Sequence, residues 1–303
     1  MTRGCAERGA TALAVLLACG CTDDLLPGET VLGAELAVAV EYGEPDSRFG
    51  EVLAWREGSL AVAAPGLPAV WLDGEWEPGP ALWVGWQGEE LVRVGVQEAD
   101  VAGVDISTVA RGDWFAASSS SLYFATDTQL HRFDGASVEV AGIVALAASD
   151  SRVAAIVCGE SCAVQTWDAD LAASLPAPAL PAGLGGALTL EGDLLCSGDP
   201  DLATDDAPGR VACEDGREVE GAVGDHLGGA IGGGYAAGSF NKWVVPPRGR
   251  LVPLDGGEVL VVERGAVGQP FRLAGGDGVL IVGAPYQPHE GRSTGAVVTV
   301  PLP

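Results

Sequence analysis

Hydrophobic and polar positions along this chain form short units, in which a tight polar turn precedes a brief apolar segment. The clearest unit reads GDGVLIVGAP at residues 276–285. Six further copies begin at Ser59, Glu90, Ser121, Arg152, Asp193 and Tyr235. Their turns are spaced by about 30 residues in the first half of the chain and by about 41 to 44 residues later, periods typical of repeat architectures. Because each apolar segment is short and bounded by turns, the pattern predicts seven repeated β-strand units.

Each interval between these units has room for three more strands. Asp-Gly pairs, which favour tight hairpins, occur at residues 73–74, 134–135, 215–216 and 255–256. Four antiparallel strands repeated seven times predict an all-β fold, a β-propeller of seven four-stranded blades. The last repeat ends after three strands, so we expect a strand at residues 35–42 to complete it from the other terminus. A β-solenoid or a pair of sandwiches is the alternative, with repeats that fit this spacing less well.

Two of the copies carry a more specific pattern. The stretches FGEVLAWREGSLAVAAPG (residues 49–66) and FRLAGGDGVLIVGAP (residues 271–285) resemble FG-GAP repeats, the blades of the integrin α-subunit propeller and of many exported bacterial proteins. This resemblance implies a propeller and, in many members, calcium held in an Asp-rich turn between the first two strands. Here those turns lack alternating carboxylates, so we expect no cofactor, with blade calcium as the alternative.

The N-terminus has the features of an export signal. Arg3 and Arg8 precede an apolar run at residues 10–18, which is shorter than the ~20 residues that span a bilayer. The following LLACGC resembles the lipobox of bacterial lipoproteins, with Cys21 favoured over Cys19 as the lipidated residue. The predicted organisation is a signal peptide (1–20), a tether (21–34) and one propeller domain (35–303), lipid-anchored at the bacterial cell envelope. A plain secretory leader is the alternative.

Cleavage before Cys21 leaves four further cysteines. Cys158 and Cys162 flank a turn, whereas Cys196 and Cys213 fall on consecutive predicted strands of one repeat. An even set in an exported chain predicts two disulfides, and pairing within each repeat requires the least movement of the backbone. A zinc site is the rival, but CxxC spacing is absent.

Composition narrows the partners. The net charge of −26, with Lys242 as the single lysine, excludes the basic stripe that nucleic acids require and disfavours anionic membrane surfaces. The 48% of hydrophobic residues suffice for a full core, and the 45 glycines and 19 prolines suit many turns.

Signatures of common enzymes such as HExxH and the phosphate-binding loop are absent, so we predict no enzymatic activity. The sequence predicts structural roles for His131 and His226. Four tryptophans cluster within residues 71–86 of the first two blades and either fill the space between blades or form a platform that stacks on sugar. They are Trp71, Trp76, Trp83 and Trp86.

Three long connections mark the predicted binding face. Between the second and third strands, the fifth, sixth and seventh units carry the loops at residues 198–209, 241–249 and 284–295. Equivalent connections of a propeller share a face, so four aspartates of the fifth unit are expected near the residues of the next two, which would bind a protein or glycan. The aspartates are Asp199, Asp201, Asp205 and Asp206, and the binding residues are Lys242, Trp243, Arg248, Tyr286, His289 and Arg292. The alternatives are salt bridges that only order the loops, and a metal-dependent enzyme that uses the aspartates with His289.

Overall fold

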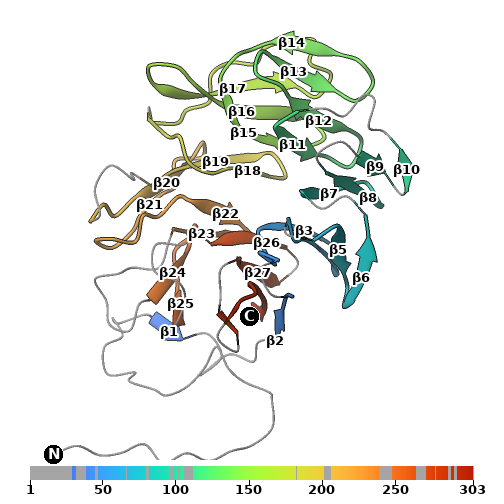
Figure 1. Cartoon of the computed structure of the whole chain (residues 1–303). Coiled ribbons are helices and arrows are strands. Elements are labelled where there is room, and N and C mark those ends of the chain that lie inside the picture. Colours follow the sequence, from blue (N-terminus) through green and yellow to red (C-terminus); the bar gives the residue numbers. More distant parts are fainter. Residues whose placement is uncertain are drawn as a thin grey trace, which may run out of the picture.

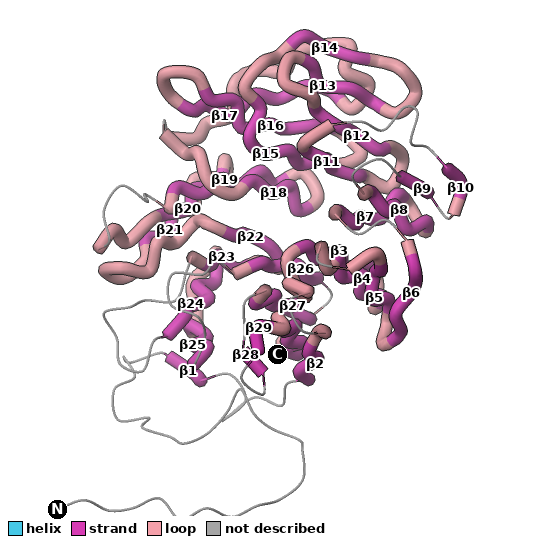
Figure 2. Tube along the Cα trace, in the orientation of Figure 1, coloured by secondary structure: helices cyan, strands magenta, loops and turns pink. Residues whose placement is uncertain are grey.

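The computed structural model describes residues 29–31, 39–44, 47–65, 67–79, 82–95, 99–101, 103–105, 112–181, 183–200, 206–238, 248–263, 271–276, 278–285, 288–289 and 292–302. Within these residues every regular element is a strand (Figure 2). The strands form seven blades, in which consecutive strands are antiparallel, and this confirms the predicted all-β propeller.

Blades one to three have four strands each. Blade one comprises β3 (Val52–Arg56), β4 (Ser59–Ala63), β5 (Ala69–Leu72) and β6 (Glu75–Pro78). Blade two comprises β7 (Trp83–Gln87), β8 (Glu90–Val94), β9 (Ala99–Val101) and β10 (Val104–Asp105). Blade three comprises β11 (Trp114–Ala117), β12 (Leu122–Ala125), β13 (Gln129–Arg132) and β14 (Ser137–Glu139).

The next two blades continue the ring. Blade four comprises β15 (Ile143–Ala148), β16 (Arg152–Cys158) and β17 (Cys162–Asp168). Blade five comprises β18 (Leu188–Glu191), β19 (Leu194–Asp199), β20 (Arg210–Cys213) and β21 (Glu218–Glu220).

The last two blades include strands from the N-terminal part of the chain. Blade six comprises β22 (Ala230–Gly232), β23 (Tyr235–Ala237), β24 (Arg248–Pro253), β25 (Val259–Glu263) and β1 (Glu29–Val31). Blade seven comprises β26 (Arg272–Gly276), β27 (Val279–Ala284), β30 (Ala296–Pro301) and β2 (Ala39–Tyr42). A small hairpin, β28 (Pro288–His289) with β29 (Arg292–Ser293), lies in the connection from β27 to β30.

The first strand of each blade contacts the first strands of both neighbouring blades, and β26 of blade seven contacts β3 of blade one. The seven inner strands therefore close a ring, with the outer strands at its rim (Figure 1). All seven apolar repeats of the sequence are second strands, and all four Asp-Gly pairs lie between third and fourth strands, as predicted.

Two N-terminal strands join the end of the ring to its beginning. β2 pairs antiparallel with β30, with Ala39 opposite Thr299, so the predicted closure of the last blade is confirmed. In addition, β1 pairs in parallel with β25, the outer strand of blade six. Residues 29–31 fall within the stretch that the sequence analysis assigned to a tether, so this part of the stretch belongs to the propeller.

Blade four departs from the expected four strands. After β17, the described chain makes only an isolated bridge, between Trp167 and Ser174, although the Leu175 amide donates to the Thr166 carbonyl at 2.8 Å. Pro176 and Pro178 follow at once, and proline has no amide to donate to a strand ladder. The prolines therefore explain why this segment runs beside the blade without forming a regular fourth strand.

The core lies between blades. Six apolar clusters each combine buried residues of two neighbouring blades, such as Val62 of blade one with Ile281 of blade seven. Between blades four and five, the Arg152 guanidinium instead donates two hydrogen bonds to the Glu214 carboxylate, at 3.0 and 2.8 Å.

The junction of blades seven and one shows why the Phe-Gly and Gly-Ala-Pro patterns occur. Phe49 is fully buried between Trp71 and Trp76, with ring centroids at 5.7 and 5.5 Å. Gly50 has a φ of 89°, and a Cβ on Gly283 would lie only 2.1 Å from the Gly50 carbonyl oxygen. The backbones of the two blades meet here at a distance that only glycine allows.

Candidate functional site

The two faces of the propeller differ in their connections. Each first strand runs away from one face, and the second strand returns to it, so the second-to-third connections share the face where first strands begin. We call this the loop face, because it carries the long connections of blades five to seven. The opposite face, the turn face, carries the first-to-second turns, including residues 118–121, 149–151 and 192–193.

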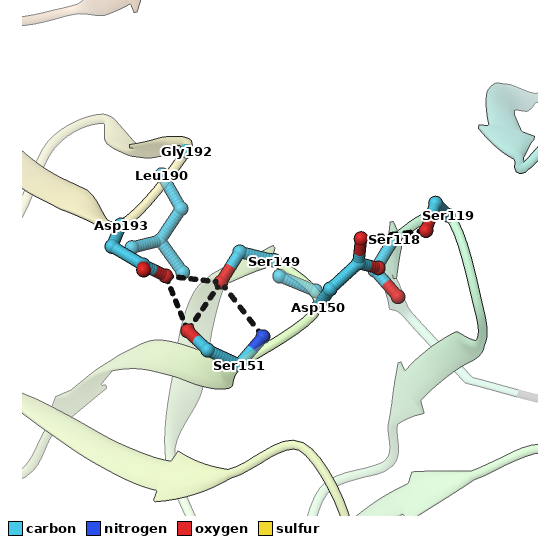
Figure 3. A pocket seen from close by; sticks show the side chains of 9 residues that line it. Ser118, Ser119, Ser149, Asp150, Ser151, Leu190, Gly192 and Asp193 are labelled. Atoms are coloured by element: carbon cyan, nitrogen blue, oxygen red, sulfur yellow. Dashed lines mark hydrogen bonds between the residues drawn. The ribbon is translucent and has the colours of Figure 1, made fainter.

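A pocket of about 520 Å³ lies on the turn face between blades three, four and five (Figure 3). The Ser119 hydroxyl donates to the Asp150 carboxylate at 2.6 Å, across the junction of blades three and four. Ser151 donates in the same way to Asp193 of blade five, and Ser149 does so at 3.4 Å. The hydrogen bond from Ser119 lowers the pKa of the Asp150 carboxyl from its ordinary 3.8.

This pattern extends to the neighbouring blades. The Gln87 side-chain amide of blade two donates to the Ser120 carbonyl at 3.4 Å, and the Gly234 amide of blade six donates to Glu191 of blade five at 3.1 Å. Polar contacts on the turn face thus join five successive blades. Since the carboxylates of Figure 3 already accept hydrogen bonds from serines of the preceding blade, this pocket is best explained as a structural seam.

A second cavity, of about 610 Å³, lies on the loop face. Its wall includes the first strands of blades one, two, three, four and seven, which lie on different sides of the ring. The cavity therefore lies on the propeller axis, and we call it the axial cavity. It opens on the face that carries the three long connections.

One wall of the axial cavity is aromatic. Trp83 and Phe115 pack against each other with ring centroids 5.7 Å apart. Trp114 and Leu82, which also line the cavity, are each 42% exposed, an unusual state for large apolar side chains. The cavity thus presents an apolar surface that no described part of the chain covers.

Three charged residues line the same cavity: Glu51, Asp113 and Arg272. The Arg272 guanidinium donates to two backbone carbonyls, those of Glu51 and Phe271, each at 3.1 Å. No carboxylate of the described residues lies within ion-pair distance of it. Glu51 pairs with Arg48 at 3.0 Å, and the Asp113 side chain is exposed. The cavity therefore offers both hydrogen-bond donors and acceptors next to aromatic rings.

The residues predicted for the binding face are only partly described. Lys242, Trp243 and Tyr286 lie outside the described residues. The backbone of the other three lies in strands at or within the long connections, and their side chains are outside the description; they are Arg248 in β24, His289 in β28 and Arg292 in β29. The loop lengths themselves agree with the prediction, since β19 to β20, β23 to β24 and β27 to β30 are the longest second-to-third connections.

Of the four aspartates predicted as metal ligands, two lie within the described residues. Asp201 and Asp205 lie outside the described residues. The Asp199 carboxylate lies 3.9 Å from the Arg210 guanidinium, and the Asp206 carbonyl accepts the Gly224 amide at 3.1 Å. Within the described part of the chain, no group of three or more His, Cys, Asp or Glu side chains could hold a metal ion.

Both predicted disulfides are present. Cys158–Cys162 joins the ends of β16 and β17, and Cys196–Cys213 joins directly opposed residues of β19 and β20. The second pair lies at the core between blades five and six, because both cysteines are almost fully buried.

The two histidines singled out in the sequence have structural contacts. His131 stacks on Phe124 of the adjacent strand at 5.0 Å, and Nδ1 of His226 lies 3.1 Å from the Pro200 carbonyl oxygen. Cys19 and Cys21 lie outside the described residues. Among the elements that are described, none is a helix long and apolar enough to cross a bilayer.

The tryptophan cluster divides between the two roles considered. Trp71 and Trp76 pack on Phe49, and the Trp86 indole donates to the Ala54 carbonyl at 3.3 Å, so these three are structural. Of these four tryptophans, Trp83 is the one that lines the axial cavity. Trp114 and Arg272 line the cavity as well, and neither was predicted as a binding residue. An alignment of the repeats would have found them, because Trp83, Trp114 and Arg272 each begin the first strand of a blade.

Comparison with known proteins adds information on the fold. No family model and no curated protein sequence matches the chain. The structure of streptogramin B lyase matches with a TM-score of 0.53 and 9% identity, over 87% of this chain and 98% of that chain. The N-terminal domain of Nup159 matches with a TM-score of 0.46 and 9% identity, over 87% and 95% of the two chains. At such low identity the lyase match shows the propeller fold alone. The chain is a seven-bladed β-propeller.

Proposed function

We propose that this protein is a non-enzymatic, lipid-anchored propeller of the bacterial cell envelope that binds a protein or glycan partner through its loop face. The observation that carries the proposal is the axial cavity, whose partly exposed aromatic wall opens on the same face as the three long connections. Ligand sites of proteins are usually concave and mostly apolar, with a few placed polar groups, and loops on a rigid scaffold supply most of them.

Two features support a location at the bacterial cell envelope. The leader resembles a lipobox, and two disulfides fit an oxidising compartment such as the envelope. Relationship to exported FG-GAP propellers is part of the same proposal, and the close approach of Gly50 and Gly283 gives a physical reason for both halves of that motif.

Membrane fractionation of cells that express the full chain tests the anchor. Cys21→Ala should move the protein from the membrane to the soluble fraction, with Cys19→Ala as the matched variant. If neither substitution, made singly, releases the protein, the lipid anchor is wrong.

Partner binding is tested by capture from envelope extracts with the purified full-length protein. Trp243→Ala combined with Arg248→Ala should weaken capture while melting changes little, because both residues are proposed to contact the partner and surface substitutions usually alter stability by under ~0.5 kcal/mol. Asp127→Ala, exposed in the short second-to-third connection of blade three, is the control. Equal loss of capture from Asp127→Ala would refute the assignment to the long connections. Metal bound at stoichiometric level to the purified protein would instead favour a metal-dependent enzyme.

A further inference from the structure

We propose that the axial cavity binds the terminal rings of a neutral glycan, which stack on Trp83 and Trp114. This inference rests on the proposed function, because it names the class of partner and the part of the loop face that recognises it. Among the described residues, four large hydrophobic side chains are exposed, and two of them, Leu82 and Trp114, line this cavity.

The form of the apolar wall suits a sugar ring. The rings of Trp83 and Phe115 pack against each other with their centroids 5.7 Å apart, which holds both rings in place. The Trp114 side chain is 42% exposed and can contact a ligand. Aromatic side chains provide large, rigid contact surfaces and lose little conformational entropy on binding. The hydrogen-bearing face of a pyranose ring is apolar, whereas its edge carries hydroxyl groups, so a sugar can satisfy aromatic and polar groups at once.

The polar groups of the cavity favour a neutral ligand. Arg272 can donate hydrogen bonds, and the carboxylates of Glu51 and Asp113 can accept them. The charges also balance, because the two carboxylates are matched by Arg272 and by Arg48, which pairs with Glu51 at 3.0 Å. A cation would meet Arg272, and an anion would meet both carboxylates in a protein of net charge −26. Hydroxyl groups, which donate and accept, fit all of these groups.

The size of the cavity limits what enters it. Its volume of about 610 Å³ lies within the range of about 300 to 1,000 Å³ of small-molecule sites. The cavity therefore takes the end of a glycan, and the remaining chain of the glycan would extend over the loop face.

Isothermal titration calorimetry of the full mature protein tests this inference. The probes are neutral di- and trisaccharides of glucose, galactose, mannose and N-acetylglucosamine, with digalacturonate and choline as charged comparisons. We expect at least one neutral probe to bind and the charged probes to bind at least about tenfold more weakly. If no neutral probe binds at millimolar concentration, or if a charged probe binds more tightly than every neutral one, the inference is overturned.

Substitutions at three positions locate the site. Trp114→Ala should weaken binding by about tenfold or more, as truncation of a central aromatic contact does. Trp76→Ala is the matched control, because Trp76 is also exposed, at 37%, but lies on the outer strand of blade one. Equal effects of the two substitutions would overturn the inference, provided that circular dichroism shows both variants folded. Asp113→Asn should weaken a neutral sugar by less than about fivefold, since an amide still accepts a hydrogen bond; a larger loss would show that the site requires the carboxylate charge and would overturn the argument for a neutral ligand.

Failure of this inference can be told apart from failure of the proposed function. If envelope capture depends on the long connections but no neutral sugar binds, the loop face has a partner and the glycan assignment is wrong. If neutral sugars bind and Trp114→Ala weakens them while capture is unaffected by Trp243→Ala with Arg248→Ala, the axial cavity stands and the long connections have lost their proposed role.

Discussion

The turn face and the loop face are built from the same seven repeats, yet different interactions hold them together. On the turn face, exposed serines and carboxylates join neighbouring blades, as between Ser119 and Asp150. On the loop face the joints are buried, and they include the Phe49 seam and the contacts of Arg250. Arg250 pairs with Glu29 of β1 at 2.8 Å and with Asp225 at 2.9 Å, and both acidic side chains are almost fully buried.

This difference follows from the length of the connections. Tight turns leave little chain to vary, so weak contacts repeated from blade to blade are sufficient there. Long connections add backbone that must be anchored. Phe49 bridges to Gly295 at the end of the blade-seven connection, and Arg250 lies in β24, which follows the blade-six connection. A face that is firmly anchored beneath its variable loops can present a binding surface without loss of the ring.

The largest expected effect comes from the loop-face seam. Phe49→Ala should lower the free energy of unfolding by about 3 to 5 kcal/mol, because it removes a fully buried aromatic ring and leaves a cavity between Trp71 and Trp76. Urea unfolding measures the loss. Trp114→Ala, at an exposed position of the same face, should cost less than about 1 kcal/mol. Similar losses of stability for Phe49→Ala and Trp114→Ala would mean that the packing of Phe49 does not contribute strongly to the contact between blades seven and one.

Charge pairs give the second comparison between the faces. Arg250→Ala should cost about 2 to 3 kcal/mol, since it leaves the carboxylates of Glu29 and Asp225 buried without their cation, with some relief from solvent because Arg250 is 18% exposed. Amide hydrogen exchange should then rise in β1. Arg217→Ala breaks an exposed pair with Asp215 on the turn face and should leave the free energy of unfolding nearly unchanged. Equal costs would contradict the comparison.

The two disulfides should differ because they close loops of different length. They span sequence separations of 17 and 4 residues. Loop-closure entropy then predicts a loss of about 3 kcal/mol when Cys196 and Cys213 are both replaced by alanine, and about 2 kcal/mol for Cys158 and Cys162. Thermal melting under non-reducing conditions measures both, and a larger loss at the short loop would show that chain entropy is not the main term.

The smallest effect belongs to the turn face and depends on pH. The Ser119 hydroxyl lowers the pKa of Asp150 below 3.8, so this contact stabilises the fold fully above about pH 4. As the pH falls through the lowered pKa, the folded carboxylate also takes up a proton and the contribution disappears. The stability difference between the protein and Asp150→Asn, under about 1 kcal/mol at pH 7, should therefore shrink towards pH 3. A difference that grows in acid would contradict this sign; Asp127→Asn is the control.

The repeat pattern was enough to predict the blades, because each apolar second strand is flanked by turns with their own sequence signals, such as Asp73-Gly74. Its spacing also located the long connections. The pattern could not predict that blade four lacks a regular fourth strand, which depends on Pro176 and Pro178 within a segment of otherwise suitable length. Nor did it reveal β1, a strand of three residues whose position depends on a distant partner, Arg250.

The candidate site was less accessible from sequence. Trp83, Trp114 and Arg272 are far apart in the chain and meet only because the ring brings the beginnings of first strands together on one axis. The long loops, where composition varies most, carry the clearest signal of a binding face in the sequence, whereas the inner strands carry none. Only the closed geometry shows that these strands share a cavity.

The pairing of β1 and β2 with the last two blades sets the order in which the propeller can finish folding. Both strands leave the ribosome early, but their partners around Val259 and Thr299 are made last. If the chain is exported as proposed, its first strands wait unpaired at the envelope until the final repeat arrives, and during that time blades six and seven keep open edges. The contacts that close the ring then form late, because they join residues far apart in the sequence. A cut just after residue 31 would remove the parallel strand from blade six, whereas a cut after residue 42 would open both blades together, so the order of proteolytic fragments reports how the ring is sealed.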